Sequence, residues 1–166
     1  MEYNQALHIA ETVKAQLAPF CERIEIAGSI RRKKATNIKD IEIVAIPLPY
    51  ETGLFQDGIA PIVNAWQKVK GELPCKYTQR ILPMNLGCAK LDLFFAEPGN
   101  WGMIYAIRTG SADYSHKILA SGWVKKGYNS IEGYLHYKGQ RVIVKEEQDL
   151  FKLIGLNYVE PEFRNL

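Results

Sequence analysis

The chain has 166 residues, of which 47% are hydrophobic and 23% charged, a globular composition that excludes a disordered or fibrous protein. No apolar run approaches the roughly 20 residues of a membrane-spanning helix, and the first residues lack the basic start and apolar stretch of a signal peptide. We therefore expect no membrane partner and a protein that is not secreted. The net charge of +3 is compatible with a polyanionic partner without identifying one.

The cysteines and histidines argue against a disulfide framework and against a zinc site. Cys21, Cys75 and Cys88 are odd in number and have no C-x-x-C spacing, and the three histidines lie far apart in the sequence. We expect reduced thiols in a cytosolic setting.

The spacing of apolar residues predicts a mixture of helices and strands along the first part of the chain. Prolines and glycines mark their ends, with Pro19 after the first helix and Pro47 after the second strand. The predicted elements are a helix over about 3–18, strands over 23–27 and 40–46, a loop over 47–58, a helix over 62–69, and strands over 76–82 and 89–95.

A break in composition at Glu97-Pro98-Gly99-Asn100 predicts a subdomain boundary. After it, the predicted elements are helices over 101–107 and 114–123, a hairpin with strands over 133–137 and 140–144, and a last short helix from 146 that Gly155 caps. A helix and mixed strands followed by helices, a hairpin and a final helix predict an α+β fold rather than a doubly wound one.

Three carboxylates are placed to share one face of the predicted sheet. Asp40 and Glu42 are two residues apart on a strand, so both point to the face opposite Ile41, and Asp92 alternates in the same way on a later strand. If these strands are neighbours, the like charges repel unless cations neutralise them, and hard oxygen ligands select Mg²⁺ or Mn²⁺. The alternative interpretation is an amphipathic strand with a solvated face.

The segment before the second strand is suited to holding phosphates. Glycine at Gly28 allows close backbone approach, the Ser29 hydroxyl can donate, and a basic run follows at residues 31–34. A basic run alone is more typical of a solvated surface. A phosphate-binding turn that leads directly into a carboxylate strand is more specific than either part.

Gly28-Ser29-Ile30-Arg31-Arg32 followed by Asp40-Ile41-Glu42 resembles the signature of the DNA polymerase beta-like nucleotidyltransferase superfamily, in particular the X family of DNA polymerases. Lys90-Leu91-Asp92 resembles the third-carboxylate motif of that family, and Thr109-Gly110-Ser111 resembles its T-G-S turn. The segment over residues 147–161 resembles the family's closing segment. These motifs occur in the family's order and cover almost the entire chain.

The resemblance implies a nucleotidyltransferase palm over about 1–98 and a small α+β, thumb-like C-terminal subdomain over about 99–166, the minimal form of the family and a monomer. It implies that Asp40, Glu42 and Asp92 bind two Mg²⁺ ions, with Mn²⁺ as the alternative, and that Asp92 helps to deprotonate a primer 3′-hydroxyl. The residues implied to hold the nucleotide are Gly28, Ser29, Arg32, Thr109, Gly110 and Ser111.

The chain departs from the family's pattern at three places. Glu42 stands where the X family usually has Asp, which weakens the polymerase assignment more than catalysis. Lys90 replaces the usual arginine beside the third carboxylate. Ile107-Arg108 stand where the family often has aromatic residues that help to exclude ribonucleotides, so sugar selectivity is open.

The resemblance to the minimal form of the family implies that duplex DNA is held through the basic face of the protein. The candidate phosphate contacts are Lys117, Lys125, Lys126, Lys138, Arg141 and Lys145, each of which can also be an ordinary solvated cation. The leading hypothesis is a metal-dependent enzyme that adds nucleotides from triphosphates to a DNA primer 3′ end in template-directed, repair-type synthesis, in the cytoplasm or wherever the DNA lies. The alternatives are a nucleotidyltransferase acting on RNA, a protein or a small molecule, and a non-catalytic nucleic-acid-binding module.

Overall fold

The protein is described by a computed structural model that covers residues 1–48 and 58–166. The chain divides into two compact units, Met1–Phe95 and Ala96–Leu166, each with its own hydrophobic core. Helices and strands occur in both, which confirms the predicted α+β class. The identification of the units as a palm and a thumb stays a prediction at this point. Over the residues described, none of the helices has the length and apolar character needed to cross a membrane.

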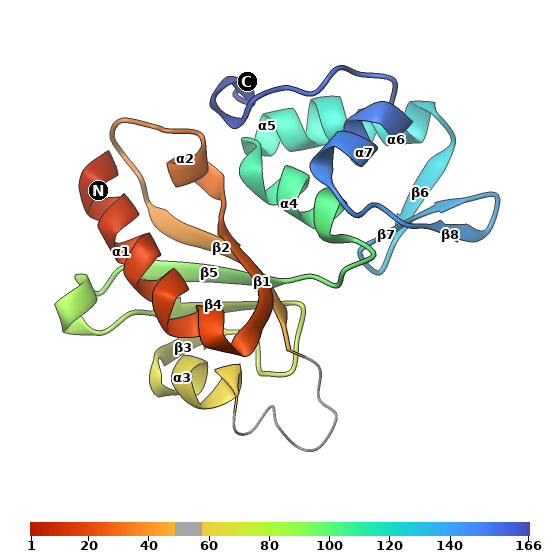
Figure 1. Ribbon diagram of the computed structural model, residues 1–166. Coiled ribbons are helices and arrows are strands. Elements are labelled where there is room, and N and C mark those ends of the chain that lie inside the picture. Colours follow the sequence, from red (N-terminus) through yellow and green to blue (C-terminus); the bar gives the residue numbers. More distant parts are fainter. Residues whose placement is uncertain (49–57) are drawn as a thin grey trace. The chain divides into compact units, whose positions relative to one another are not determined.

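The first unit is built on a five-stranded mixed sheet with the order β1-β2-β5-β4-β3 (Figure 1). Strands β2 and β5 pair in parallel, and the other neighbours pair antiparallel. Its elements are α1 (Tyr3–Leu17), η1 (Ala18–Phe20), β1 (Cys21–Ile26), α2 (Gly28–Arg31), β2 (Asp40–Pro47), α3 (Ile59–Ala65), β3 (Gln67–Lys70), β4 (Tyr77–Ile81), η2 (Met84–Leu86) and β5 (Lys90–Phe95).

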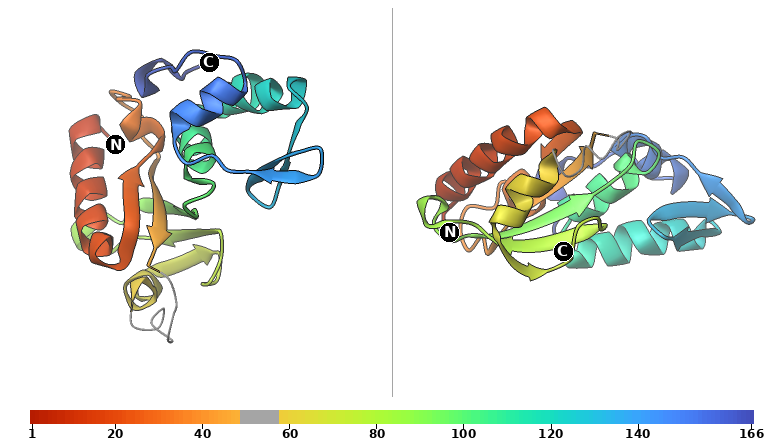
Figure 2. Two further views of the ribbon diagram at one scale, coloured as in Figure 1. Left: turned by 45° about the vertical axis from the view of Figure 1, so that its right-hand side comes forward. Right: turned by 90° about the horizontal axis from the view of Figure 1, so that it is seen from below.

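Helices α1 and α3 cover one face of this sheet (Figure 2). The apolar residues of α1 recur at helical spacing, and Val13 and Leu17 are completely buried against the sheet. The strands contribute Ile41 and Leu91 to the same core, as the alternation in the sequence predicts. Burial of such a side chain stabilises the fold by about 1.5–3 kcal/mol. Because strand side chains alternate, the polar residues of β2 and β5 lie on the opposite face.

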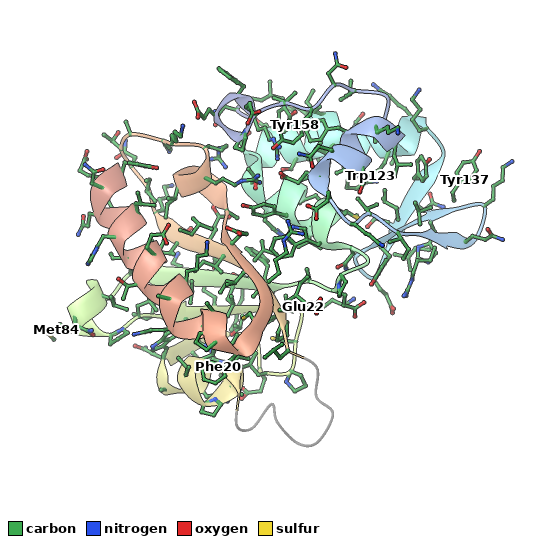
Figure 3. All side chains as sticks on the ribbon, viewed as in Figure 1. Phe20, Glu22, Met84, Trp123, Tyr137 and Tyr158 are labelled. Atoms are coloured by element: carbon green, nitrogen blue, oxygen red, sulfur yellow. The ribbon has the colours of Figure 1, made fainter. Side chains whose placement is uncertain are left out.

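The second unit combines helices with a three-stranded antiparallel sheet in the order β6-β7-β8. Figure 3 shows Trp123 and Tyr158 among its helices and Tyr137 on its sheet. The elements are α4 (Trp101–Thr109), α5 (Ala112–Tyr114), the π-helical turn η3 (Ser115–Ala120), α6 (Ser121–Lys125), β6 (Tyr128–Ile131), β7 (Tyr134–Tyr137), β8 (Gln140–Val142), α7 (Glu147–Leu153) and the 3₁₀ turn η4 (Pro161–Phe163).

A buried ion pair ties the end of the chain to α7. Arg164 is completely buried, and its Nη1 donates to Oε1 of Glu147 at 2.6 Å, while its Nε donates to the carbonyl oxygen of Val159 at 2.8 Å. The guanidinium also lies over the rings of Phe151 and Tyr158, with its Cζ about 5 Å from each centroid. The third guanidinium nitrogen, Nη2, is buried without a hydrogen-bond partner among the described residues. The hydrogen bonds to Glu147 and Val159 hold the C-terminal segment to this unit.

The structure corrects two predicted elements. The helix expected over 62–69 lies earlier, at Ile59–Ala65, because Trp66 turns to an extended conformation with φ −87° and ψ 145°. The next residues, Gln67–Lys70, form strand β3 against β4 instead of continuing the helix. The expected hairpin is present, but a third strand, Tyr128–Ile131, pairs with β7 and was not predicted. Most of the loop predicted over 47–58 lies outside the described residues.

Candidate active site

The polar face of the first unit carries the three carboxylates singled out in the sequence. Strands β2 and β5 are neighbours, and their parallel register aligns Glu42 with Asp92 and Asp40 with Lys90. Residues aligned in this way present their side chains on the same face of the sheet. The condition on which the sequence argument depended, that the two strands are adjacent, is therefore met.

The carboxylate of Glu42 is packed into the corner formed by Gly28 and Ser29. Gly28 has a φ of +58°, and a Cβ atom built there would lie 1.6 Å from Oε2 of Glu42. The Ser29 backbone N–H donates to the Glu42 carboxylate, and the Ala27 N–H donates to the Glu42 carbonyl oxygen at 2.8 Å. Only glycine satisfies both the positive φ and this close approach. The corner predicted to hold phosphate is thus in direct contact with the carboxylate strand.

The electrostatics of Glu42 reflect its burial and the like charges beside it. Burial, and then the negative charge of Asp92, raises the pKa of Glu42 to about 7, with a smaller contribution from Asp40. The positive charge of Arg32 and the Ser29 N–H oppose this rise. A carboxyl with this pKa is only partly ionised at neutral pH. Cations close to this face would therefore favour its charged form.

The other two carboxylates are held in different ways. Oδ1 of Asp40 lies 3.3 Å from Nζ of Lys90, but this buried oxygen accepts no hydrogen bond. Oδ1 of Asp92 accepts two hydrogen bonds, from the hydroxyl of Tyr77 and from Nε2 of Gln79, both at 2.7 Å. Asp92 therefore has a defined orientation, whereas Asp40 keeps a buried oxygen that no donor satisfies.

These residues fit a divalent cation in their donor chemistry. Three carboxylates supply the hard oxygen ligands that Mg²⁺ and Mn²⁺ prefer, and Asp40 Oδ1 is a buried acceptor without a donor. Over residues 1–48 and 58–166, however, no group of three or more His, Cys, Asp or Glu side chains is arranged so that it could hold a metal ion. The Glu42 carboxylate accepts the Ser29 N–H and lies against Gly28.

Arg32 lies close to this corner from the end of α2. Its Nη2 donates to Oγ of Ser29 at 3.2 Å, and its charge acts on Glu42. Burial lowers the pKa of the guanidinium, and the negative charge of Glu42 opposes the change. Gly28, Ser29 and Arg32 are therefore gathered beside Glu42, as the sequence predicts. Their assignment to a nucleotide triphosphate stays a prediction.

Thr109, Gly110 and Ser111 belong to the second unit, where they join α4 to α5. Thr109 is buried, and a Cβ on Gly110 would lie 2.7 Å from Oγ of Ser115. The Ser111 hydroxyl accepts the N–H groups of Tyr114 at 3.1 Å and Leu166 at 3.2 Å, as an N-cap does. The Ser111 N–H donates to the carbonyl oxygen of Arg164 at 2.9 Å. These contacts explain the T-G-S sequence by local structure and leave its proposed role toward nucleotide untested.

The cations predicted to contact DNA all lie on the second unit and are all exposed: Lys117, Lys125, Lys126, Lys138, Arg141 and Lys145. Lys117 forms an exposed ion pair with Asp113 at 3.3 Å. Arg141 lies over the ring of Tyr134, with Cζ 4.0 Å from its centroid, and Lys138 Nζ is 5.4 Å from that of Tyr137. Exposure is compatible with phosphate contacts and equally with solvated side chains.

Two site residues were missed in the sequence, Tyr77 and Gln79. They alternate on the predicted strand over 76–82, which was the available signal that they share a face. What the sequence lacks is the register of β4 against β5, which aligns Gln79 with Asp92 and Tyr77 with Phe94. Without that register nothing connects these neutral side chains to the carboxylates.

Comparison with known proteins gives one match in the second unit. No curated protein matches the chain. Residues 106–165 match the family model of the DNA polymerase beta thumb. The matched segment runs from the end of α4 through the β6-β7-β8 sheet and α7 to the buried Arg164. This match supports a relation of the second unit to the X-family DNA polymerases.

Proposed function

We propose that the protein is a metal-dependent nucleotidyltransferase that adds nucleotides to the 3′ end of a DNA primer, in template-directed, repair-type synthesis. The observation that carries the proposal is the register that places Glu42 beside Asp92, with Asp40 on the same strand and Gly28-Ser29 against Glu42. The match of residues 106–165 to a DNA polymerase thumb supports DNA as the acceptor over RNA, a protein or a small molecule.

In this proposal the first unit carries the chemistry. Asp40, Glu42 and Asp92 would hold two Mg²⁺ ions, with Mn²⁺ as the alternative. When bound, these ions would neutralise charge on the triphosphate and on the attacking and leaving oxygens. Asp92 accepts the proton of the primer 3′-hydroxyl. At the same time, the oxygen of that hydroxyl forms a bond to the α-phosphorus of the nucleotide. The bond from that phosphorus to the bridging oxygen breaks, and pyrophosphate leaves.

The phosphate-binding role falls to the corner beside Glu42. Arg32 brings a fixed cation with forked donors, and Ser29 brings a hydroxyl and a backbone N–H. The Ser29 N–H is engaged by Glu42 in the structure, so nucleotide and Glu42 compete for this donor. A cation bound to the Glu42 carboxylate would free the Ser29 N–H for the nucleotide. Nucleotide binding would then be coupled to metal binding.

The second unit would hold DNA by phosphate contacts through its exposed cations, with Arg141 and Lys138 on the hairpin and Lys125 and Lys126 at the end of α6 as the leading pairs. Contacts to phosphates release counterions, so affinity for duplex should fall steeply as salt rises.

The test is extension of a labelled primer, with and without template, in the presence of Mg²⁺ or Mn²⁺ and a single deoxynucleotide. We expect template-dependent incorporation that Asp92→Asn reduces at least about a thousandfold, with the circular dichroism spectrum unchanged. The control is Glu11→Gln, which removes an exposed carboxylate of α1 and should retain activity. Labelling of non-DNA acceptors alone, or duplex binding without incorporation, would overturn the proposal in favour of the two alternatives.

A further inference from the structure

We infer that Tyr77 and Gln79 are positioning residues that fix the Asp92 carboxylate for cation binding. They donate to Oδ1 of Asp92, and the other carboxylate oxygen, Oδ2, would be the one open to a divalent cation. This inference rests on the proposed function, because it assigns Asp92 to the metal. Neither residue belongs to the motifs that pointed to the site, and both come from β4 rather than from the carboxylate strands.

The geometry at Asp92 is a two-donor clamp on a single oxygen. The Tyr77 hydroxyl and Gln79 Nε2 each lie 2.7 Å from Oδ1 of Asp92. Gln79 is aligned with Asp92 across the antiparallel β4–β5 pair, and Tyr77 is on the same face, two residues away. Two donors that converge on one oxygen fix the rotation of the carboxylate about its Cβ–Cγ bond. Within the part of the chain that the structure describes, Oδ2 accepts no hydrogen bond.

The clamp is itself held in place. The Tyr77 ring is stacked on Phe94, its cross-strand partner, with centroids 4.8 Å apart and an interplanar angle of 20°. Lys70 Nζ lies 5.1 Å from the centroid of the same ring. The tyrosine therefore has contacts that fix its ring independently of its hydroxyl. Removal of the hydroxyl alone should leave the ring stacked on Phe94 and release one of the two donors at Asp92.

The chemistry of the two donors matters as well as their position. Tyr77 and Gln79 are neutral, so they orient Asp92 without neutralising it, unlike Lys90, which lies 3.3 Å from Asp40. An ion pair at Asp92 would compete with a bound cation for the carboxylate charge, whereas neutral donors do not. Outer hydrogen bonds of this kind orient metal ligands, and their loss usually weakens metal affinity or activity by about 10- to 100-fold.

The experiment combines three variants with two readouts. Tyr77→Phe removes the hydroxyl and keeps the stacked ring, Gln79→Met removes the amide and keeps the side-chain length, and the double variant removes both donors. The first readout is the affinity for Mn²⁺ of the protein without DNA or nucleotide, from the electron paramagnetic resonance signal of free Mn²⁺. The second is single-nucleotide extension, from which kcat and the nucleotide KM are separated. Gln67→Met, an exposed change on β3, is the matched control.

We expect each single variant to weaken Mn²⁺ binding and lower kcat by about 3- to 10-fold, and the double variant by about 10- to 100-fold, with the nucleotide KM changed less than about twofold. In an Asp92→Asn background, Tyr77→Phe should have no further effect on Mn²⁺ affinity. If the Tyr77 hydroxyl had a purely structural role, Tyr77→Phe would weaken Mn²⁺ binding in the Asp92→Asn background as well.

The outcomes separate this inference from the proposed function. If the wild-type protein binds Mn²⁺ and extends primers but the double variant matches it in both readouts, the positioning role is wrong and the proposed function stands. If the wild type neither binds Mn²⁺ nor extends any primer, both are wrong. If Gln79→Met fails to fold by circular dichroism, Tyr77→Phe alone decides, since its ring contacts are retained.

Discussion

The two units of the protein bury charge in opposite ways. In the first unit, burial, and then the negative charge of Asp92 with a smaller contribution from Asp40, raises the pKa of Glu42 to about 7. In the second unit, Glu147 is paired directly with the fully buried Arg164 at 2.6 Å. Like charges close together oppose folding unless a ligand neutralises them, whereas a buried charge that lies directly against its opposite is part of the fold.

This difference separates residues that serve a ligand from residues that serve stability. Removal of one partner of the Glu147–Arg164 pair leaves an uncompensated buried charge. Removal of the charge of Glu42 relieves repulsion. The free energy of unfolding should therefore rise, while the site loses a carboxylate for the cation.

The largest effect on stability is expected from the second unit. Arg164→Met should destabilise the second unit by about 3–5 kcal/mol. The substitution leaves the Glu147 carboxylate buried without its cationic partner and removes the hydrogen bond to Val159. Urea unfolding followed by tryptophan fluorescence gives the free energy of unfolding. Trp101 and Trp123 report on this unit and Trp66 on the first.

The double variant Glu147→Gln with Arg164→Met is the control for this prediction, since neither charge remains to be buried. We expect it to be more stable than Arg164→Met alone. Equal stabilities of the single variant and the wild type would show that the pair contributes nothing and would remove the contrast between the two units.

The second prediction concerns the pH dependence of stability in the first unit. The folded-state pKa of Glu42 is raised from 4.5 to about 7, so the folded protein binds a proton more tightly than the unfolded chain. The contribution of Glu42 is therefore most favourable below pH 4.5 and is lost as the pH rises through 7. Glu42→Gln, measured with a chelator present, should match the wild type at pH 4 and exceed it by up to about 3 kcal/mol at pH 8.

An equal difference between Glu42→Gln and wild type at both pH values would contradict a raised pKa of Glu42 in the folded protein. Addition of Mn²⁺ at pH 8 sharpens the comparison. It should stabilise the wild type more than the variant, because the variant keeps Asp40 and Asp92 but lacks the Glu42 carboxylate that a cation would hold in its charged form.

Much of the first unit was predictable, because its core strands alternate clearly. Apolar Ile41 and Leu91 and polar Asp40 and Asp92 assign each side of β2 and β5 from the sequence alone. The adjacency of the two strands was a condition in the sequence argument, since strand order depends on contacts between distant segments. The structure supplied that adjacency through the parallel pairing of β2 and β5.

The parts that the sequence did not predict depend on long-range register or on weak local signals. Tyr77 and Gln79 reach Asp92 only through the alignment of β4 with β5. Strand β6 contains Asn129 and Ser130, which have little strand propensity, so its pairing with β7 is decided by the tertiary structure. The hydrogen bond from the Ser29 N–H to Glu42 was also not predictable from the sequence, because it depends on the positive φ of Gly28.

The smallest effect on stability is expected at Ser29. The backbone N–H of this residue contacts Glu42, whereas its hydroxyl is the group proposed to contact the nucleotide. Ser29→Ala keeps the backbone N–H that contacts Glu42 and removes the hydroxyl that accepts from Arg32 at 3.2 Å. Stability should change by less than about 1 kcal/mol, and the nucleotide KM should rise about three- to tenfold with kcat nearly unchanged, as expected for one lost hydrogen bond in nucleotide binding. A fall in kcat at constant KM would instead place the Ser29 hydroxyl in the chemical step. An unchanged KM would mean that the corner holds Glu42 and not the triphosphate.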